Sequence, residues 1–139
     1  MDITLSHFDD LLRAARSQVD PQRLLLVFAG VELPDDATPA QRAGFASGQG
    51  GALVPMMCVD KSADELPSFA ALQAEAAAAT PPGQEWALVF VAAMSGSNGS
   101  APTSDDASAP LQRMTESIRA GVFGQAIAFD RLGLPVQFD

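Results

Sequence analysis

Apolar residues recur at helical spacing near the start of the chain. This stripe consists of Phe8, Leu11, Leu12 and Ala15. Such spacing predicts an amphipathic helix that buries one face. Ser6 is the expected N-cap, with Asp9 three residues later as the acid of a capping box. Pro21 follows the stripe and predicts that the helix has ended before it.

Three continuous apolar runs predict buried strands, at residues 23–31, 52–60 and 86–93. Runs that lack polar alternation are typical of strands covered on both faces. Pro55 lies inside the second run and cannot donate a ladder hydrogen bond. That strand is therefore expected at a sheet edge or with a bulge.

Helical signals separate these strands. Residues 32–51 contain a short helix signal, with Thr38 as cap and Pro39 in the first turn, and form either a lid or a surface extension. A helix capped by Ser62 is expected to run to residue 79, and another follows the loop at residues 95–102. Residues 125–129 and 134–138 flank a turn that contains Gly133, which predicts a C-terminal hairpin.

The order of these elements predicts an α/β or α+β fold. We expect a single domain over residues 1–139, with a mixed sheet of about five strands covered by three or four helices. The chain is 47% hydrophobic and 18% charged, which is enough apolar side chain to form a core.

Net charge and cysteine content limit the classes of partner and the cellular compartment that we expect for this chain. The formal charge of −9 opposes binding to nucleic acid or to an anionic membrane, because both require clustered basic side chains. No apolar run approaches the roughly 20 residues that cross a bilayer, and the N-terminus does not resemble a signal peptide. One cysteine allows no internal disulfide. We therefore expect a cytoplasmic location. The high apolar content, the low charged fraction and the possible edge strand favour a protein partner or a homo-oligomer.

Reactive side chains are scarce. The chain has one histidine (His7), one cysteine (Cys58), one lysine (Lys61) and no tyrosine. A His/Cys zinc site cannot be assembled from them, and no metal, cofactor or catalytic residue is expected. Cys58 lies within a predicted strand, which favours a buried structural thiol over a nucleophile.

Polar residues at the strand ends offer an alternative. These candidate ligand-binding residues are Glu32, Asp60, Lys61, Ser95 and Ser97. If the strands run parallel, their carboxyl ends share one rim, where open α/β sheets bind ligands. The competing interpretation is that Lys61 is solvated and that Ser62 caps the next helix. The loop at residues 95–102 lacks a phosphate-binding motif and is typical of a flexible linker.

Segments along nearly the whole chain resemble a small family of proteobacterial proteins labelled "ribonucleotide reductase subunit alpha". The resemblance covers residues 23–36, 50–61, 90–96, 109–114 and 129–131. It implies an accessory association with that enzyme. Literal reductase catalysis is excluded, because it needs a thiyl-forming cysteine and a redox pair, whereas this chain has Cys58 alone.

The layout of the first half is similar to the amino-terminal domain of the enhanced-serine-sensitivity protein B family. It shares a helix with Phe8, a first strand, a glycine before residues 53–57 and the stretch at residues 61–66. This resemblance implies a small α/β fold. The leading interpretation is a non-catalytic protein-interaction or accessory module that can self-associate. The alternative is a small-molecule-binding or enzymatic domain that uses the rim around Lys61.

Overall fold

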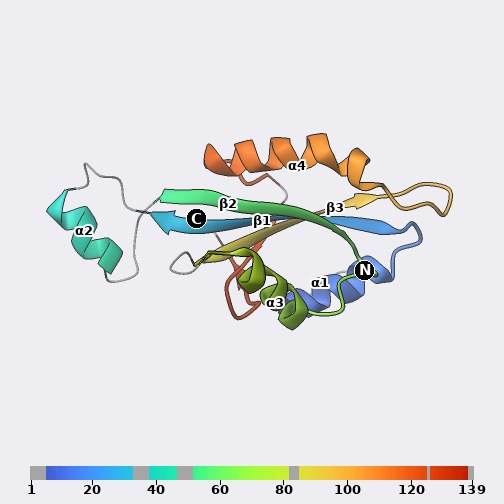
Figure 1. The fold of residues 1–139 in the computed structure, drawn as a ribbon, viewed down its shortest axis with the longest axis horizontal. Coiled ribbons are helices and arrows are strands. Elements are labelled where there is room, and N and C mark those ends of the chain that lie inside the picture. Colours follow the sequence, from blue (N-terminus) through green and yellow to red (C-terminus); the bar gives the residue numbers. More distant parts are fainter. Residues whose placement is uncertain (1–5, 33–37, 47–51, 82–84, 125, 138–139) are drawn as a thin grey trace.

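A five-stranded antiparallel sheet with strand order β2-β1-β3-β4-β5 forms the centre of the fold (Figure 1). The computed structural model describes residues 6–32, 38–46, 52–81, 85–124 and 126–137. The strands are β1 (Gln22–Glu32), β2 (Ala52–Ser62), β3 (Leu88–Ser95), β4 (Ile127–Phe129) and β5 (Pro135–Val136). The helices are α1 (Phe8–Arg16), α2 (Pro39–Ala46), α3 (Phe69–Ala79) and α4 (Ser104–Arg119).

The predicted fold class is confirmed, including the five strands, the covering helices and the C-terminal hairpin formed by β4 and β5. One detail of the sheet differs from the prediction. Every pairing between the described strands is antiparallel, so the sheet is not mixed. Strands β2 and β3 flank β1 on opposite sides, and both are antiparallel to it.

Strand β1 explains the long apolar run near the N-terminus, because its alternate side chains enter two separate cores. Leu24, Leu26 and Phe28 face the core with α1 and α3, whereas Leu25, Val27 and Ala29 face the core with α4. All six residues are less than 5% exposed. Burial of a leucine or phenylalanine side chain stabilises the fold by roughly 1.5–3 kcal/mol. The sheet is therefore covered on both faces, with α4 on one side and α1 and α3 on the other (Figure 1).

Helix α1 begins one residue later than its sequence predicts. The N-cap is His7, whose Nδ1 accepts a hydrogen bond from the Asp9 backbone N–H at 3.0 Å. Asp10, rather than Asp9, accepts from the His7 N–H at 3.1 Å and completes the capping box. Asp9 instead accepts a hydrogen bond from the Phe69 N–H at 2.8 Å, at the start of α3. The two adjacent carboxylates thus serve two different helices.

Helix α3 also begins later than predicted. Ser62 and Glu65 form the expected reciprocal hydrogen bonds, Ser62 N–H to Glu65 at 2.7 Å and Glu65 N–H to Ser62 at 3.3 Å. These bonds close a turn but do not start the helix, because Pro67 disfavours helical backbone at the residue before it. Ser68 is the N-cap and accepts from the Ala71 N–H at 3.2 Å.

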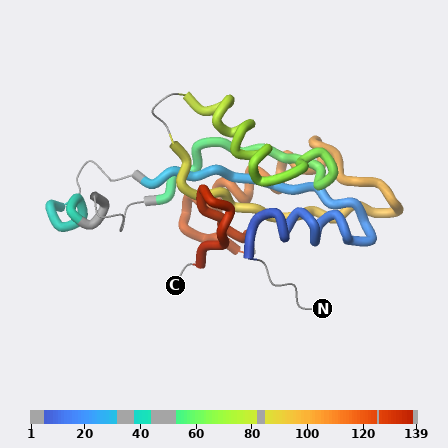
Figure 2. Tube along the Cα trace, turned by 90° about the horizontal axis from the view of Figure 1, so that it is seen from below, coloured from blue at the N-terminus to red at the C-terminus, as the bar shows by residue number. Residues whose placement is uncertain are grey.

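The C-terminal hairpin packs against the start of α1 (Figure 2). The Phe8 N–H donates to the Gly133 carbonyl at 2.8 Å. Gly133 has φ of 80°, and a Cβ there would lie 2.5 Å from His7 Nε2. The turn therefore needs glycine both for its backbone and for the close approach of His7.

Helix α2 lies beyond the end of β1 and β2 in both views and covers neither face of the sheet (Figures 1 and 2). Residues 38–43 are exposed. This placement favours the surface-extension interpretation of the segment between β1 and β2 over a lid.

Candidate functional site

The five residues of the predicted rim do not gather at one end of the sheet. Glu32 pairs with Ala52 at one end of the β1–β2 ladder, whereas Lys61 pairs with Leu24 towards the other. Ser95 pairs with Gln22 at that second end. The shared rim required parallel strands, and the antiparallel pairing separates Glu32 from the rest; its side chain lies outside the described residues.

Asp60 and Lys61 point to opposite faces, as neighbours in a strand must. Lys61 Nζ donates to Glu75 Oε1 of α3 at 2.7 Å. Asp60 Oδ2 accepts a hydrogen bond from Arg23 Nε at 2.6 Å, and Arg23 Nη2 forms an ion pair with the same oxygen at 2.5 Å. The other oxygen of Asp60 accepts from Ser104 Oγ, in the first turn of α4, at 3.1 Å. The two residues therefore link β2 to helices on different sides of the sheet.

The environment of Asp60 favours its ionised form. Partial burial raises the pKa of its carboxyl, but hydrogen bonds from Arg23 and Ser104 and the positive charge of Arg23 outweigh that effect. The pKa consequently lies below its ordinary value of 3.8. Side chains of Arg23 and Asp60 are 15% and 17% exposed, so this pair is shielded from solvent more than a surface ion pair.

Ser95 and Ser97 take part in local structure. Gln22 Nε2 donates to Ser95 Oγ at 2.9 Å and to the Asp20 carbonyl at 3.0 Å. Ser97 and Ser100 exchange backbone hydrogen bonds at 3.0 and 2.9 Å, which close the turn after β3. The rim alternative therefore lacks the shared pocket that it predicts.

His7 and Cys58 do not form a catalytic pair. Because His7 Nδ1 accepts from a backbone N–H, its Nε2 carries the hydrogen and donates to the Leu132 carbonyl at 3.1 Å. His7 lies against Phe69 at the start of α3, whereas Cys58 faces α4 across the sheet. Among the residues that the structure describes, no cluster of His, Cys, Asp or Glu is placed to hold a metal ion.

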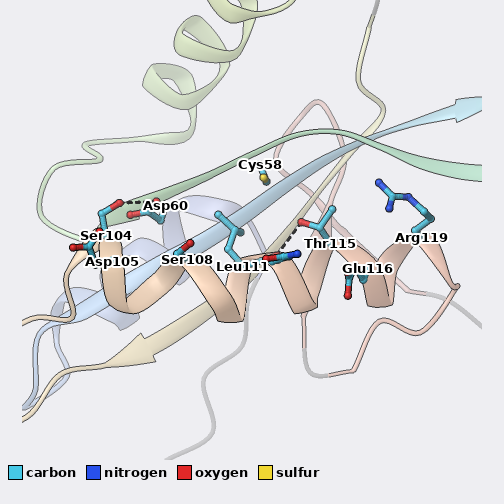
Figure 3. A pocket seen from close by; sticks show the side chains of 10 residues that line it. Cys58, Asp60, Ser104, Asp105, Ser108, Leu111, Thr115, Glu116 and Arg119 are labelled. Atoms are coloured by element: carbon cyan, nitrogen blue, oxygen red, sulfur yellow. Dashed lines mark hydrogen bonds between the residues drawn. The ribbon is translucent and has the colours of Figure 1, made fainter.

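A groove of about 510 Å³ runs between β2 and α4 (Figure 3). Strand β2 contributes Cys58 and Asp60. One face of α4 contributes a stripe at helical spacing, made of Ser104, Asp105, Ser108, Leu111, Gln112, Thr115, Glu116 and Arg119. Sequence reasoning considered only the apolar face of this helix. The helical spacing of these polar residues could have been recognised in the sequence. That they face β2 could be known only from the fold.

Cys58 is exposed in this groove, which corrects the expectation of a buried thiol. It pairs with Val27 of β1, but its own side chain points to the α4 side at the border of the sheet. A strand at an edge lacks a neighbour to cover its side chains, and α4 leaves this position open.

The other face of β2 has an apolar groove of about 190 Å³ against α3. Its apolar lining is Phe28, Met57, Val59, Leu72, Ala76 and Ala79. The Lys61–Glu75 ion pair also borders this groove. Strand β2 is thus flanked by a polar groove on its α4 side and an apolar groove on its α3 side.

Strand β2 is the long free edge of the sheet. It has 11 residues and no partner among the described strands on its outer side. The opposite edge, β5, has two residues and begins with Pro135. Pro55 fulfils both parts of its prediction, because β2 is an edge strand and Met56 is the extra residue of a bulge. The ladder with β1 is regular from Met57 to Ser62.

Neither a search for membrane-spanning helices nor comparisons with known proteins adds to the description of the site. Within the described part of the chain, no helix combines the length and apolar character that a membrane crossing requires. No protein-family model, curated protein or solved structure matches this chain.

Proposed function

We propose that this chain is a cytoplasmic, non-catalytic protein-interaction module that binds an extended protein segment along the outer edge of β2. The carrying observation is an 11-residue edge strand with a groove on each face. In β-strand addition, backbone hydrogen bonds supply affinity and alternate side chains supply specificity. The geometry therefore offers both parts of this binding mode.

The two grooves define the chemistry of the bound segment. Side chains on one face of an added strand would meet Met57 and Val59 beside α3, so apolar residues fit there. Side chains on the other face would meet the hydroxyl, amide and charged groups of α4. A segment with alternating apolar and polar residues matches this arrangement, because successive residues of a strand face opposite ways.

Charge and local irregularity restrict the binding segment further. Asp60 is paired with Arg23 and Lys61 with Glu75, so these two charges of the edge are compensated within the chain. Pro55 and the bulge at Met56 interrupt the edge, as in natural sheets that avoid indiscriminate pairing. Binding is accordingly expected along the regular stretch from residue 57 to residue 62.

Affinity purification of the full chain from its native host tests this proposal. Cys58→Arg places a long charged side chain in the groove, whereas Val19→Arg changes a residue that is 99% exposed elsewhere. We expect a protein recovered in near-equal amount with the wild type and Val19→Arg, and at least tenfold less with Cys58→Arg. Mass spectrometry then identifies it; a reductase subunit is one partner to look for.

Hydrogen exchange supplies the direct readout on the purified complex. We expect slower exchange in residues 57–62, because backbone N–H groups on the free edge become bonded to the partner. Equal recovery with all three proteins, together with unchanged exchange in β2, would show that binding occurs elsewhere and would overturn the proposal.

A further inference from the structure

We propose that the segment bound at β2 is β2 of a second copy, paired antiparallel across a two-fold axis perpendicular to the sheet. This inference rests on the proposed function and names its partner. The two five-stranded sheets would then form one continuous ten-stranded sheet. Such an axis leaves each face of the sheet on its own side, so the α4 helices of both copies lie on one face and the α3 helices on the other.

The α3 side of β2 is compatible with its own copy. Met57 and Val59 are partly buried against the core and line the apolar groove. Because the two-fold axis brings the same face of each β2 together, these residues would meet apolar residues of the second copy. Apolar cross-strand pairs stabilise a sheet. The apolar groove would thus receive side chains of matching character.

The stripe on α4 supplies the stronger argument, because its charge pattern is complementary to itself when reversed. Asp60 accepts from Ser104, so the N-terminus of α4 lies at the Asp60 end of the groove and Arg119 at the other end (Figure 3). A two-fold axis reverses the second helix. Asp105 of each copy then faces Arg119 of the other, at both ends of the interface.

Three further residues of the stripe follow the same pairing. With the axis beside Gln112, Ser108 faces Glu116 and Gln112 faces its own counterpart. A hydroxyl opposite a carboxylate, and an amide opposite an amide, are hydrogen-bonding pairs. All five residues of this reversed pairing line the groove.

The axis passes close to Cys58, so residues 57–59 of the regular stretch form the centre of the pairing and residues 60–62 face the bulged part of the second β2. This residue lies in the central part of the groove in Figure 3, between the ends marked by Asp60 and Arg119. In a two-fold antiparallel pair, the residue on the axis lies opposite its own copy. Directly opposed residues have Cα atoms roughly 4.5–5.5 Å apart. The exposed thiol of Cys58 is therefore a built-in reporter of this dimer.

Net charge does not prevent this association. The chain carries −9, but exposed charges separated by more than about 8 Å are largely screened at physiological ionic strength. The nearest charges of β2 are compensated within each copy. Those of the α4 ends attract their reversed counterparts.

Sedimentation of the full chain over a range of concentrations tests the pairing. We expect a dimer that is weakened roughly tenfold by Arg119→Glu, since two ion pairs become two repulsive contacts. The double variant Asp105→Arg/Arg119→Glu should recover most of that loss. Arg113→Glu is the matched control, because Arg113 is exposed on α4 and does not line the groove. A short bis-maleimide should link Cys58 between copies, and should not link a Cys58→Ser/Val19→Cys variant.

The outcomes separate this inference from the proposed function. If the protein is a monomer at every concentration, the inference that a second copy binds β2 is overturned. The proposed function would still be supported if a different protein is recovered with the wild type and is lost with Cys58→Arg. A dimer that Cys58→Arg abolishes, but that ignores the charge changes, overturns the α4 pairing. A dimer unaffected by all of these variants, in a protein that recovers no other partner, overturns both.

Discussion

Removal of the Asp60 carboxylate is a direct test of how the end of the β1–β2 ladder is held. Asp60 accepts one hydrogen bond from Arg23, with which it also forms an ion pair, and one from Ser104. Hydrogen bonds to charged groups contribute about 1.5–3 kcal/mol. Because both side chains of the ion pair are partly exposed, at 15% and 17%, the lower part of that range applies. Asp60→Ala should therefore reduce the free energy of unfolding by about 2 kcal/mol.

Urea unfolding of four proteins isolates the interaction. The wild type, Asp60→Ala, Arg23→Met and the double variant form a double-mutant cycle, in which Met keeps the aliphatic stem of the arginine. We expect a coupling energy of about 1–2 kcal/mol near neutral pH. Asp64→Ala is the control, because Asp64 is exposed in the turn after β2, and its effect should stay within about 0.5 kcal/mol.

The coupling should also depend on pH in one direction. The pKa of Asp60 is lower in the folded protein than its ordinary value of 3.8, so its contribution is complete well above that value. It is lost as the pH falls through the folded-state pKa and the carboxyl becomes protonated. A coupling energy below about 0.3 kcal/mol near neutral pH, or one that persists unchanged in acid, would refute this reasoning.

Three further changes test other parts of the molecule. Leu26→Ala removes a fully buried side chain and should lower the free energy of unfolding by about 2–5 kcal/mol in urea titrations; a loss below about 1 kcal/mol would contradict the packing. Gly133→Ala should be more destabilising than Gly121→Ala by about 1 kcal/mol or more, because both have positive φ but only Gly133 abuts His7; equal thermal unfolding temperatures would argue against that contact. Cys58 should react with a chromogenic disulfide reagent in the native monomer, at protein concentrations below those at which the proposed dimer forms, and a requirement for denaturant would show that the thiol is buried.

The sequence predicted local structure better than it predicted the candidate site. The run from Leu24 to Ala29 indicated a strand buried on both faces, and Pro55 indicated an edge or bulge; both predictions are confirmed. These signals are local. The polarity of a side chain determines whether that residue can be buried, and the missing N–H of a proline removes a ladder hydrogen bond at that residue.

The wrong predictions of helix starts arose where one sequence pattern was compatible with two sets of hydrogen bonds. Asp9 and Asp10 are equivalent in sequence, and only the position of α3 shows that Asp9 bonds to Phe69. The capping pattern at Ser62 is real but closes a turn, because Pro67 delays the helix. Local reading cannot resolve such competition, since the deciding partner is distant in the chain.

The candidate site depended on strand direction, which no local pattern encodes. Lys61 at a shared rim required parallel neighbours, and the antiparallel ladder places it beside Glu75 instead. The polar face of α4 could be read from its spacing, but its position beside Cys58 follows from the packing of α4 against β1 and β2.

The central place of β1 has a consequence for synthesis of the protein. This strand leaves the ribosome before β3 and α4, yet it needs β3 for its second ladder and α4 to cover Leu25 and Val27. Both elements are translated much later, because α4 ends at Arg119. A nascent chain therefore carries an uncovered apolar strand until β3 and α4 have emerged, and such exposed strands aggregate unless they are protected. Ribosome-associated chaperones should accordingly engage this chain between the emergence of β1 and that of α4.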